Sequence, residues 1–266
     1  MTALRITPLF AFGSRRALRI IERNLLVYKH GWLVLLSGFF EPLFYLLSIG
    51  FGLGRMVGDV PGPAGEPIPY ALFVAPALLA ASSMNGAITE STFNFFFKLN
   101  YDKTFASILT TPMSPADISL GELAWALIRG ALYTIGFLGV MVVMGLVKSP
   151  LVLLTLPGSL LIGFAFAAVG MAATSFMRTW QDFDLIQLVI LPMFLFSGTF
   201  FPLDAFPEPA RILIQLTPLY HGVDLLRTLS VGVIGPQTLV HVAYLTAMGL
   251  VGLAVVSRRL DKLLLK

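Results

Sequence analysis

The sequence LIQLVILPMFLFSGTFFPLDAFPEPARILIQLTPLYHGVDLLRTLSVG, residues 185–232, decides the fold of this chain. It begins as an apolar helix, turns at Ser197-Gly198 and stays apolar although several prolines follow. Two short segments come next, Pro209 to Leu216 and Pro218 to Val231, each with a proline in its first turn, where the missing N–H costs nothing. Both are shorter than the roughly 20 residues that cross a membrane. We predict a re-entrant or interfacial helical hairpin over residues 202–232, covered by protein or lining a cavity; the alternative is an ordinary external loop that is apolar.

The composition is that of a membrane protein with several spans. The 266 residues are 57% hydrophobic and 12% charged, with a mean hydropathy of +0.86, whereas soluble domains carry about 25% charged residues. Six of the 18 Lys and Arg residues precede the first long apolar segment, and four lie in the last nine residues. This placement predicts that both termini are cytoplasmic and that the number of spans is even. It also argues against a nucleic-acid partner, in spite of the net charge of +4.

No motif for catalysis or metal binding is present in the sequence. It has no cysteine and three widely spaced histidines, His30, His221 and His241, so we expect no disulfide, thiolate metal site or histidine metal cluster. The phosphate-binding pattern GxxxxGK[ST] is absent, as are HExxH and GxSxG. We therefore expect no catalytic residue and no ATP hydrolysis by this chain alone.

We predict an all-α polytopic membrane protein, with residues 1–266 as a single transmembrane domain. Six spans are expected, at about residues 31–53, 70–93, 122–146, 151–176, 185–201 and 237–257. Residues 14–30 should form an amphipathic helix in the membrane interface. Its apolar stripe is Leu18, Ile21, Leu25 and Tyr28, and its cations Arg15, Arg19 and Arg23 would lie near lipid head groups. The alternative is a charged flank that only fixes topology.

Four polar residues of the first two spans are candidates for a translocation pathway. Glu41 precedes Pro42 near the middle of the first span. An ionised carboxylate there costs at least ~3 kcal/mol, so it should be protonated, paired or facing a cavity. Ser82, Asn85 and Thr89 share one face of the second span, which must turn toward a partner helix or a pathway. Structural roles, as a neutral hydrogen-bonded glutamic acid and as helix packing, are the alternatives.

The largest predicted cytoplasmic loop covers residues 95–121. Residues 101–109 can form a short helix, and Ser114-Pro115-Ala116-Asp117 is a capped start for the next one. In the third span, Arg129 either extends to the interface or pairs with an acidic group in the bundle.

Four sequence segments carry a resemblance to a known family. SGTFFPLDAFP (197–207) and TPLYHGVDLLR (217–227) resemble the region before the last span in membrane subunits of type-2 ABC exporters. EPLFYLLSIGFGL (41–53) looks closest to nodulation-factor and related permeases, within a family that also exports polysaccharides, lipids and drugs. TPMSPADI (111–118) resembles the end of the loop that contacts the ATPase. The commoner acidic-arginine pair followed by Gly-Thr is missing there.

The resemblance implies an exporter in the plasma membrane of a bacterium. Two such permeases, identical or paralogous, would assemble with two ABC ATPase subunits, which would bind ATP and Mg while this chain binds no cofactor. Membrane lipids would surround the complex, and the substrate would be lipid-linked, amphipathic or drug-like. The implied ATPase-coupling residues are Tyr101, Asp102, Lys103, Thr104, Phe105 and Ser107. The implied outer-gate hairpin contains Ser197, Gly198, Pro202, Asp204, Pro207, Pro218 and Arg227.

Two other functions are weaker interpretations. A secondary transporter or channel could use Glu41 and the polar face of the second span for ions, but it is typically built from internal inverted repeats, and none is convincing here. A membrane enzyme acting on lipids would need acids, histidines or arginines clustered at one interface, and the sequence offers no such cluster.

Overall fold

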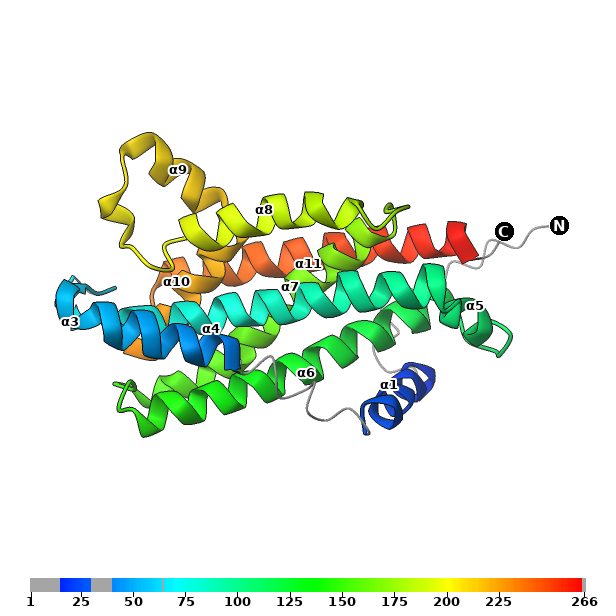
Figure 1. The fold of residues 1–266 in the computed structure, drawn as a ribbon, viewed down its shortest axis with the longest axis horizontal. Helices are drawn as coiled ribbons and strands as arrows, with labels where there is room; N and C mark the ends of the chain where they lie inside the picture. Colours follow the sequence, from blue (N-terminus) through cyan, green and yellow to red (C-terminus); the bar gives the residue numbers. More distant parts are fainter. Residues whose placement is uncertain (1–14, 30–39, 64, 265–266) are drawn as a thin grey trace.

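A computed structural model describes residues 15–29, 40–63 and 65–264. In these ranges the chain is helical except for connecting turns and one small antiparallel sheet, in which β1 (Asp59–Pro61) pairs with β2 (Pro67–Pro69). The long helices lie side by side along the longest axis of the molecule, with α4 (Tyr70–Thr89) in the middle (Figure 1).

Four helices are long and apolar enough to cross a membrane: Tyr70–Tyr101, Pro115–Val143, Pro150–Thr174 and Pro236–Leu264. The first joins α4 to the π-helical turns η2 (Glu90–Asn94) and η3 (Phe97–Tyr101), and the third joins the 3-10 turn η4 (Pro150–Leu154) to α7 (Thr155–Thr174). The second is α6 and the fourth is α11. At 1.5 Å per residue each exceeds the roughly 30 Å of hydrocarbon. Four of the six predicted spans are therefore confirmed as helices of sufficient length.

The first and fifth predicted spans are not among the four helices that are long and apolar enough to cross a membrane. Residues 40–45 are helical and continue into η1 (Leu46–Leu53) and α3 (Gly54–Val57), but residues 31–39 lie outside the described part of the chain. α8 (Asp182–Phe196) has 15 residues and no buried side chain. The six-span count therefore stays a prediction.

The amphipathic N-terminal helix is present as α1 (Arg15–Tyr28), which lies across the first half of α6 (Figure 1). Leu18 and Leu25 of the predicted stripe are 55% and 52% exposed, and so are free to meet lipid. The face that contacts the bundle contains Tyr28 of the stripe and the buried residues Ile20 and Asn24, which the stripe did not include. Ser14 and His30, at the predicted ends, are outside the described residues.

The predicted loop over residues 95–121 starts too early. The second span stays helical to Tyr101 because its polar residues Asn94 and Lys98 have buried partners inside the bundle. Lys103, with φ of 53°, separates this helix from α5 (Thr104–Ile108), which is shorter than the predicted helix over 101–109. The capped start at Ser114 is confirmed, since its side chain and that of Asp117 form a reciprocal capping box.

In residues 185–232, the stretch quoted at the start of the sequence analysis, two short helices follow α8. Gly198, with φ of 71°, turns the chain into η5 (Leu203–Ala205), which leads to α9 (Glu208–Leu216) and α10 (Pro218–Val231). α10 is packed within the bundle, whereas α9 projects from it (Figure 1). Two short helices with prolines in their first turns were predicted here and are confirmed.

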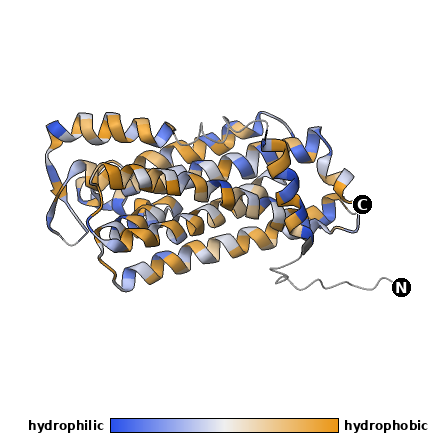
Figure 2. Ribbon diagram, turned by 90° about the horizontal axis from the view of Figure 1, so that it is seen from below, coloured by the Kyte–Doolittle hydropathy of each residue, from blue (hydrophilic) through white to orange (hydrophobic). Residues whose placement is uncertain are grey.

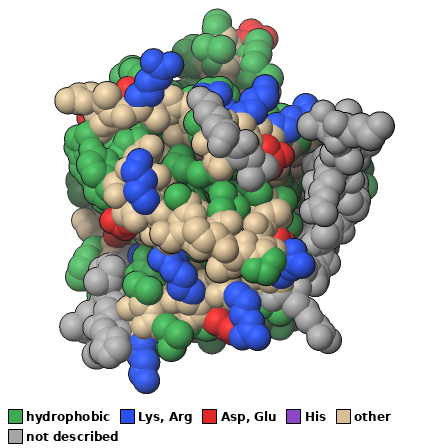
Figure 3. All heavy atoms as spheres, turned by 90° about the vertical axis from the view of Figure 1, so that its right-hand side faces the viewer, with side chains coloured by type: hydrophobic (Ala, Val, Ile, Leu, Met, Phe, Trp, Pro, Cys, Tyr) green, Lys and Arg blue, Asp and Glu red, His purple; other side chains and the backbone are tan. Residues whose placement is uncertain are grey.

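The two ends of the bundle differ in charge. We call them the α5 end, where α11 also finishes, and the α9 end, where α3 and the small sheet lie (Figure 1). Lys and Arg side chains are spread over the α5 end (Figure 3), while hydrophobic residues dominate the length between the ends (Figure 2). Exposed cations toward the α5 end include Arg16, Arg19, Lys29, Lys103, Arg178, Arg258 and Lys262.

Candidate functional site

A cavity of about 730 Å³ lies between residues 41–60, α4, α8 and the turn at 200–202. Its wall is mainly apolar, with side chains such as Tyr45, Ile190, Phe194 and Phe200. Polar groups come from Glu41, Asn85, Thr89 and Gln187. The cavity therefore offers an apolar length and a polar patch, the two surfaces that an amphipathic molecule needs.

A smaller cavity of about 180 Å³ shares Glu41 and Asn85 with the first. Its wall adds Ser82 from α4 and Arg129 and Tyr133 from α6. All four predicted pathway candidates, Glu41, Ser82, Asn85 and Thr89, thus line one cavity, although they come from two separate spans. Among the alternatives for Glu41, the structure places it facing a cavity, with an exposed side chain.

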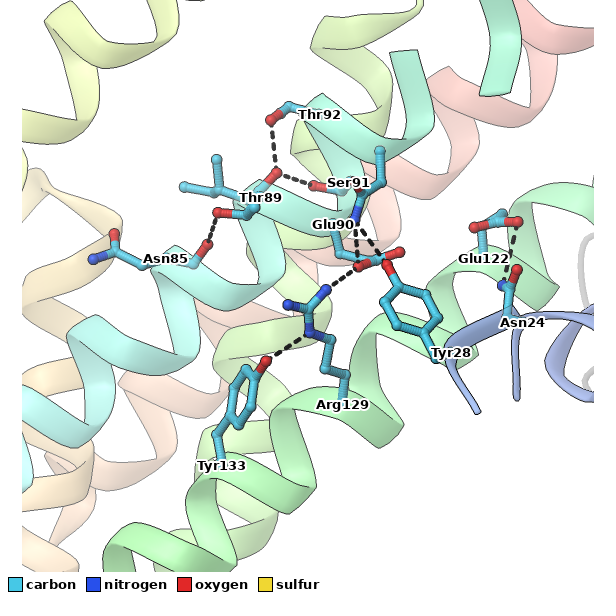
Figure 4. Close-up of polar contacts among 12 residues, drawn as sticks. Asn24, Tyr28, Asn85, Thr89, Glu90, Ser91, Thr92, Glu122, Arg129 and Tyr133 are labelled. Carbon is cyan, nitrogen blue, oxygen red and sulfur yellow. Dashed lines mark hydrogen bonds and ion pairs between the residues drawn. The ribbon is translucent and has the colours of Figure 1, made fainter. Parts of the chain in front are cut away.

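Behind the smaller cavity lies a buried group of charges that we call the ion cluster, made of Glu90, Lys98, Glu122 and Arg129. Arg129 donates to Glu90 Oε2 at 2.6 Å, and its Nε donates to the Tyr133 hydroxyl at 2.7 Å (Figure 4). Of the two alternatives for Arg129, pairing inside the bundle is therefore the one found. Only 1% of the Glu90 side chain is exposed, so its charge needs a buried partner of opposite sign, and Arg129 provides one.

The second ion pair of the cluster is equally close. Lys98 Nζ lies 2.6 Å from Glu122 Oε2 and 3.8 Å from Glu90 Oε1. Asn24 of α1 donates to Glu122 Oε1 at 3.4 Å. Two carboxylates thus face two cations, and the cluster joins η2 and η3 of the second span to α6 while also contacting α1.

Tyr28 brings the end of α1 into the same cluster. Asn94 donates to both the Tyr28 hydroxyl and Glu90 Oε2, at 3.3 and 2.8 Å. Burial, with a smaller contribution from Glu90, raises the pKa of Tyr28 to about 12. The phenol is therefore protonated at physiological pH and accepts from Asn94 as a neutral group. Arg129 also lies 5.7 Å from the centre of the Tyr28 ring, within the range of a cation–π contact.

Two of the predicted interfacial cations of α1 are not part of the ion cluster and make contacts within α1. Arg19 pairs with Glu22 on the exposed face of α1 at 2.7 Å, and Arg23 donates to Asn24 Oδ1 at 3.3 Å. The side chain of Arg15 is outside the described part of the structure.

The predicted ATPase-coupling residues lie at the α5 end, around α5. Tyr101, Asp102, Lys103 and Ser107 are exposed, and Thr104 is half-buried. Phe105 differs, because it is fully buried with its ring centre 4.9 Å from that of Phe95. It can anchor α5 to the bundle but offers no surface to a partner. Lys98 of the ion cluster lies only three residues before Tyr101, so this surface and the smaller cavity are joined through buried charges.

The predicted outer-gate residues are divided between the surface and the interior. Asp204 is exposed and pairs with Arg211 at 3.2 Å, and Pro202 lines the larger cavity. Ser197 lies 3.1 Å from the Thr217 hydroxyl oxygen. Pro207 is the residue before α9, and Pro218 starts α10.

Arg227, counted with the outer residues from the sequence, is buried with 6% exposure. It donates to the carbonyl oxygens of Gly198, at 2.7 Å, and Phe73, at 3.3 Å. Its guanidinium lies 3.7 Å from the centre of the Phe73 ring. Arg227 therefore ties α10 to α4 and to the turn after α8.

The wide spacing of the three histidines in the sequence suggested that they lie apart, but two of them meet in the structure. His221 and His241, 20 residues apart, meet between α10 and α11 with 2.8 Å between their Nδ1 atoms. No sequence motif signals this contact, because it depends on how α10 and α11 pack against each other. Within the described residues, no group of three His, Cys, Asp or Glu side chains could hold a metal ion.

Comparison with known proteins identifies the family. Residues 16–230 match the family model described as "ABC-2 type transporter". This chain belongs to that family. Its membrane subunits are permeases without catalytic activity of their own, and the ATPase is a separate subunit.

Similar proteins include several named Nodulation protein J. The one from Rhizobium leguminosarum bv. trifolii is 35% identical over 222 residues, which cover 83% of each chain. The one from Rhizobium leguminosarum bv. viciae is 32% identical over 254 residues, 93% of this chain and 96% of the relative. That from Rhizobium meliloti (strain 1021) is 34% identical over 83% of this chain and 82% of the relative. These bacterial relatives agree with the resemblance seen in residues 41–53.

Proposed function

We propose that this chain is the membrane subunit of an ATP-driven exporter and that an amphipathic substrate moves along the larger cavity. The observation that carries the proposal is the cavity itself, which combines an apolar wall with the polar group formed by Glu41, Asn85 and Thr89. The apolar part of a substrate would lie along α8 and residues 45–57. Its polar part would lie at the polar group, next to the smaller cavity.

A second subunit would complete this pathway. α8 forms one wall of the cavity, and its opposite side exposes Leu185, Leu188 and Val189 by 64% to 70%. Such a side is stable against lipid or against another apolar helix. We propose that a second copy, or a paralogous permease, lies beside α8.

ATP binding by the partner subunits would act on the exposed residues around α5. The second span runs without interruption from Tyr101 to the cavity, and the ion cluster links it to α6 and α1. A displacement of α5 would therefore move Lys98 and, through Glu90 and Arg129, the wall of the smaller cavity. The bacterial plasma membrane, with the α5 end in the cytoplasm, is the setting that fits the cations at this end.

The first experiment is purification of the tagged chain from its native membrane in mild detergent. We expect an ATP-hydrolysing subunit of the P-loop type in stoichiometric amount. Recovery of the chain alone, still active in ion or solute flux, would overturn the proposal in favour of a secondary transporter.

The purified complex then allows a direct test of the cavity in lipid vesicles. Because the chain has no cysteine, Leu191→Cys and Val251→Cys can each be labelled with a bulky maleimide. The two side chains are similarly exposed, at 59% on α8 and 64% on α11, but only Leu191 lines the cavity. Alkyl glycosides, alkylammonium ions and alkyl carboxylates are tested as amphipathic activators of ATP hydrolysis. We expect the label at Leu191→Cys to abolish activation and the label at Val251→Cys to preserve it; equal effects of the two labels would contradict the assignment of the cavity.

A further inference from the structure

The proposed pathway does not use the buried histidines that join α10 to α11. His221 and His241 are 9% and 5% exposed. The Nδ1 atoms are 2.8 Å apart, and Nε2 of His241 lies 2.9 Å from Asp224 Oδ2. The Tyr244 ring stacks on His221 with 4.0 Å between ring centres. These four side chains form one compact contact between the two helices.

The neighbouring carboxylate decides where the protons of the neutral rings are. Nε2 of His241 carries a hydrogen and donates it to Asp224, because a carboxylate only accepts. Nδ1 of a neutral His241 is then a bare acceptor. In the neutral pair His221 supplies the hydrogen of the Nδ1–Nδ1 contact. Its Nε2 is then the site for an added proton, which the backbone of Gln215 can accept in a hydrogen bond.

The same arrangement limits how many protons the contact can bind. A first added proton goes to Nε2 of His221, and the hydrogen bond between the rings remains because His221 still donates and His241 still accepts. A second added proton can go only to Nδ1 of His241, whose lone pair accepts that bond. Two N–H groups would then face each other at 2.8 Å between two imidazolium ions, so this contact must open.

The other titratable groups around the pair do not remove this limit. Besides Asp224, α10 contributes Tyr220 and Arg227, and α11 contributes Tyr244, whose hydroxyl donates to the Leu216 carbonyl. α4 contributes only Tyr70, which donates to the Phe200 carbonyl, while α7 and η4 have no titratable residue. On α9, Glu208 and Arg211 are present, and Arg211 pairs with Asp204. Asp224 is thus the carboxylate that contacts the pair, and it stabilises a single added charge.

α10 has a second attachment that does not depend on these rings. Arg227 holds it to Phe73 of α4 and to Gly198 after α8. If the histidine contact opens, α10 therefore stays attached to α4 and separates from α11.

We propose that His221, His241 and Asp224 form a proton-binding site that holds α10 against α11 and releases it when the rings bind two added protons. Acid at the α9 end would then loosen the hairpin from the last long helix. This inference concerns a contact within the chain and does not depend on the substrate or direction of transport.

Cysteine accessibility in the full chain tests the proposal in membranes. Leu245 is fully buried and lies four residues after His241, on the same face of α11. Val256 is equally buried on α11 but lies toward its α5 end. Leu245→Cys and the control Val256→Cys are treated with a dithiodipyridine, which reacts with thiols in acid as well as at neutral pH. Each variant has one thiol, since the sequence has no cysteine.

We expect the Leu245→Cys reaction to accelerate from about pH 7.5 to about pH 5, by up to about tenfold per pH unit once the second proton is binding. Val256→Cys should show no such change. His221→Asn, added to Leu245→Cys, should remove the acceleration, because the asparagine amide can donate in place of Nδ1 but binds no proton. His30→Gln should leave it intact. The absence of acceleration with both histidines present, or its persistence in His221→Asn, would overturn the proposal.

A measurement on the unsubstituted chain covers the case in which His221→Asn fails to fold. Nitrogen-15 labelling of histidine gives signals from three rings only. We expect His221 and His241 to bind their protons in two separated steps, with the second accompanied by a change in the surrounding signals. Simple, independent titration of both rings would also overturn the proposal.

Discussion

Glu90 is a carboxylate with 1% of its side chain exposed, near the end of the second predicted span. Such a charge is costly in a membrane unless a partner neutralises it, and Arg129 does so at 2.6 Å. The second oxygen of Glu90 has no hydrogen bond within the described residues and faces Lys98 at 3.8 Å. Glu90 therefore depends on both cations, which come from different helices.

Removal of one partner should show this dependence. Arg129→Gln leaves Glu90 facing only the more distant Lys98, and we expect the free energy of unfolding to fall by about 3 kcal/mol. Arg19→Gln is the matched control, because it breaks an exposed pair worth about 0–1 kcal/mol. Thermal unfolding of the purified variants in one detergent measures the difference. Equal losses in the two variants would contradict the account, because they would show that an unpaired carboxylate at the buried position of Glu90 costs no more than a broken exposed pair.

The double variant separates the ion pair from simple loss of a side chain. Glu90→Gln together with Arg129→Gln removes both charges, and its amides can still hydrogen-bond to each other. We expect it to be more stable than Arg129→Gln alone, since no unpaired carboxylate remains. A double variant less stable than the single one would contradict this account.

The docking of α1 depends on a single small residue of α6. A Cβ atom added at Gly121 would lie 2.7 Å from Cβ of Ile20, which is too close for a normal contact. Gly121 thus allows α1 to approach α6 closely enough for Asn24 to reach Glu122. The sequence motif analysis did not identify this glycine, because its neighbour is about 100 positions away.

Gly121→Ala should therefore displace α1. We expect it to lower the free energy of unfolding by about 1–3 kcal/mol through overpacking. Gly130→Ala, on the same helix, has no atom within 4 Å of the added carbon and should stabilise by about 0.5–1 kcal/mol. Thermal unfolding of the pair tests the contact, and a stabilised Gly121→Ala would mean that α1 does not rest on α6.

The ends of helices were predicted correctly where the residues at the end itself determine it. The bounds of α10 follow from Pro218 and Gly232, and the start of α6 follows from the capping box of Ser114 and Asp117. The end of the second span was misplaced because Lys98 appears polar in the sequence and has a buried partner in the fold. Phe105 was included among the coupling residues because of the family resemblance, and its burial could not be predicted because it depends on Phe95 across a turn.

The candidate site was predictable in part. An acidic residue within a span and a polar stripe at helical spacing are both unfavourable in contact with lipid. For this reason Glu41 and the polar face of α4 could be chosen as candidates from the sequence. The partners Arg129 and Tyr133 come from α6 and could not be assigned to that face from spacing alone. The histidine pair was missed because it arises where two helices cross.

At the scale of the whole molecule, the distribution of charge predicts how the bundle is oriented in the membrane. Exposed cations gather at the α5 end (Figure 3), and the four long helices run between this end and the α9 end (Figure 1). Lys and Arg are retained on the cytoplasmic side of a membrane. The bundle should therefore lie across the membrane with its α5 end in the cytoplasm.

Labelling of intact cells tests this orientation together with the second, third and fourth predicted spans. Because the chain has no cysteine, Met56→Cys, Lys148→Cys, Ser107→Cys and Thr179→Cys each give one thiol at an exposed position. We expect a membrane-impermeant maleimide to react with positions 56 and 148 in intact cells, because they lie at the α9 end, and with positions 107 and 179 only after the membrane is permeabilised. Labelling after denaturation is the control for equal amounts of protein. Reaction at 107 and 179 in intact cells would reverse the orientation, and labelling of 148 from the opposite side to 56 would contradict the second and third predicted spans.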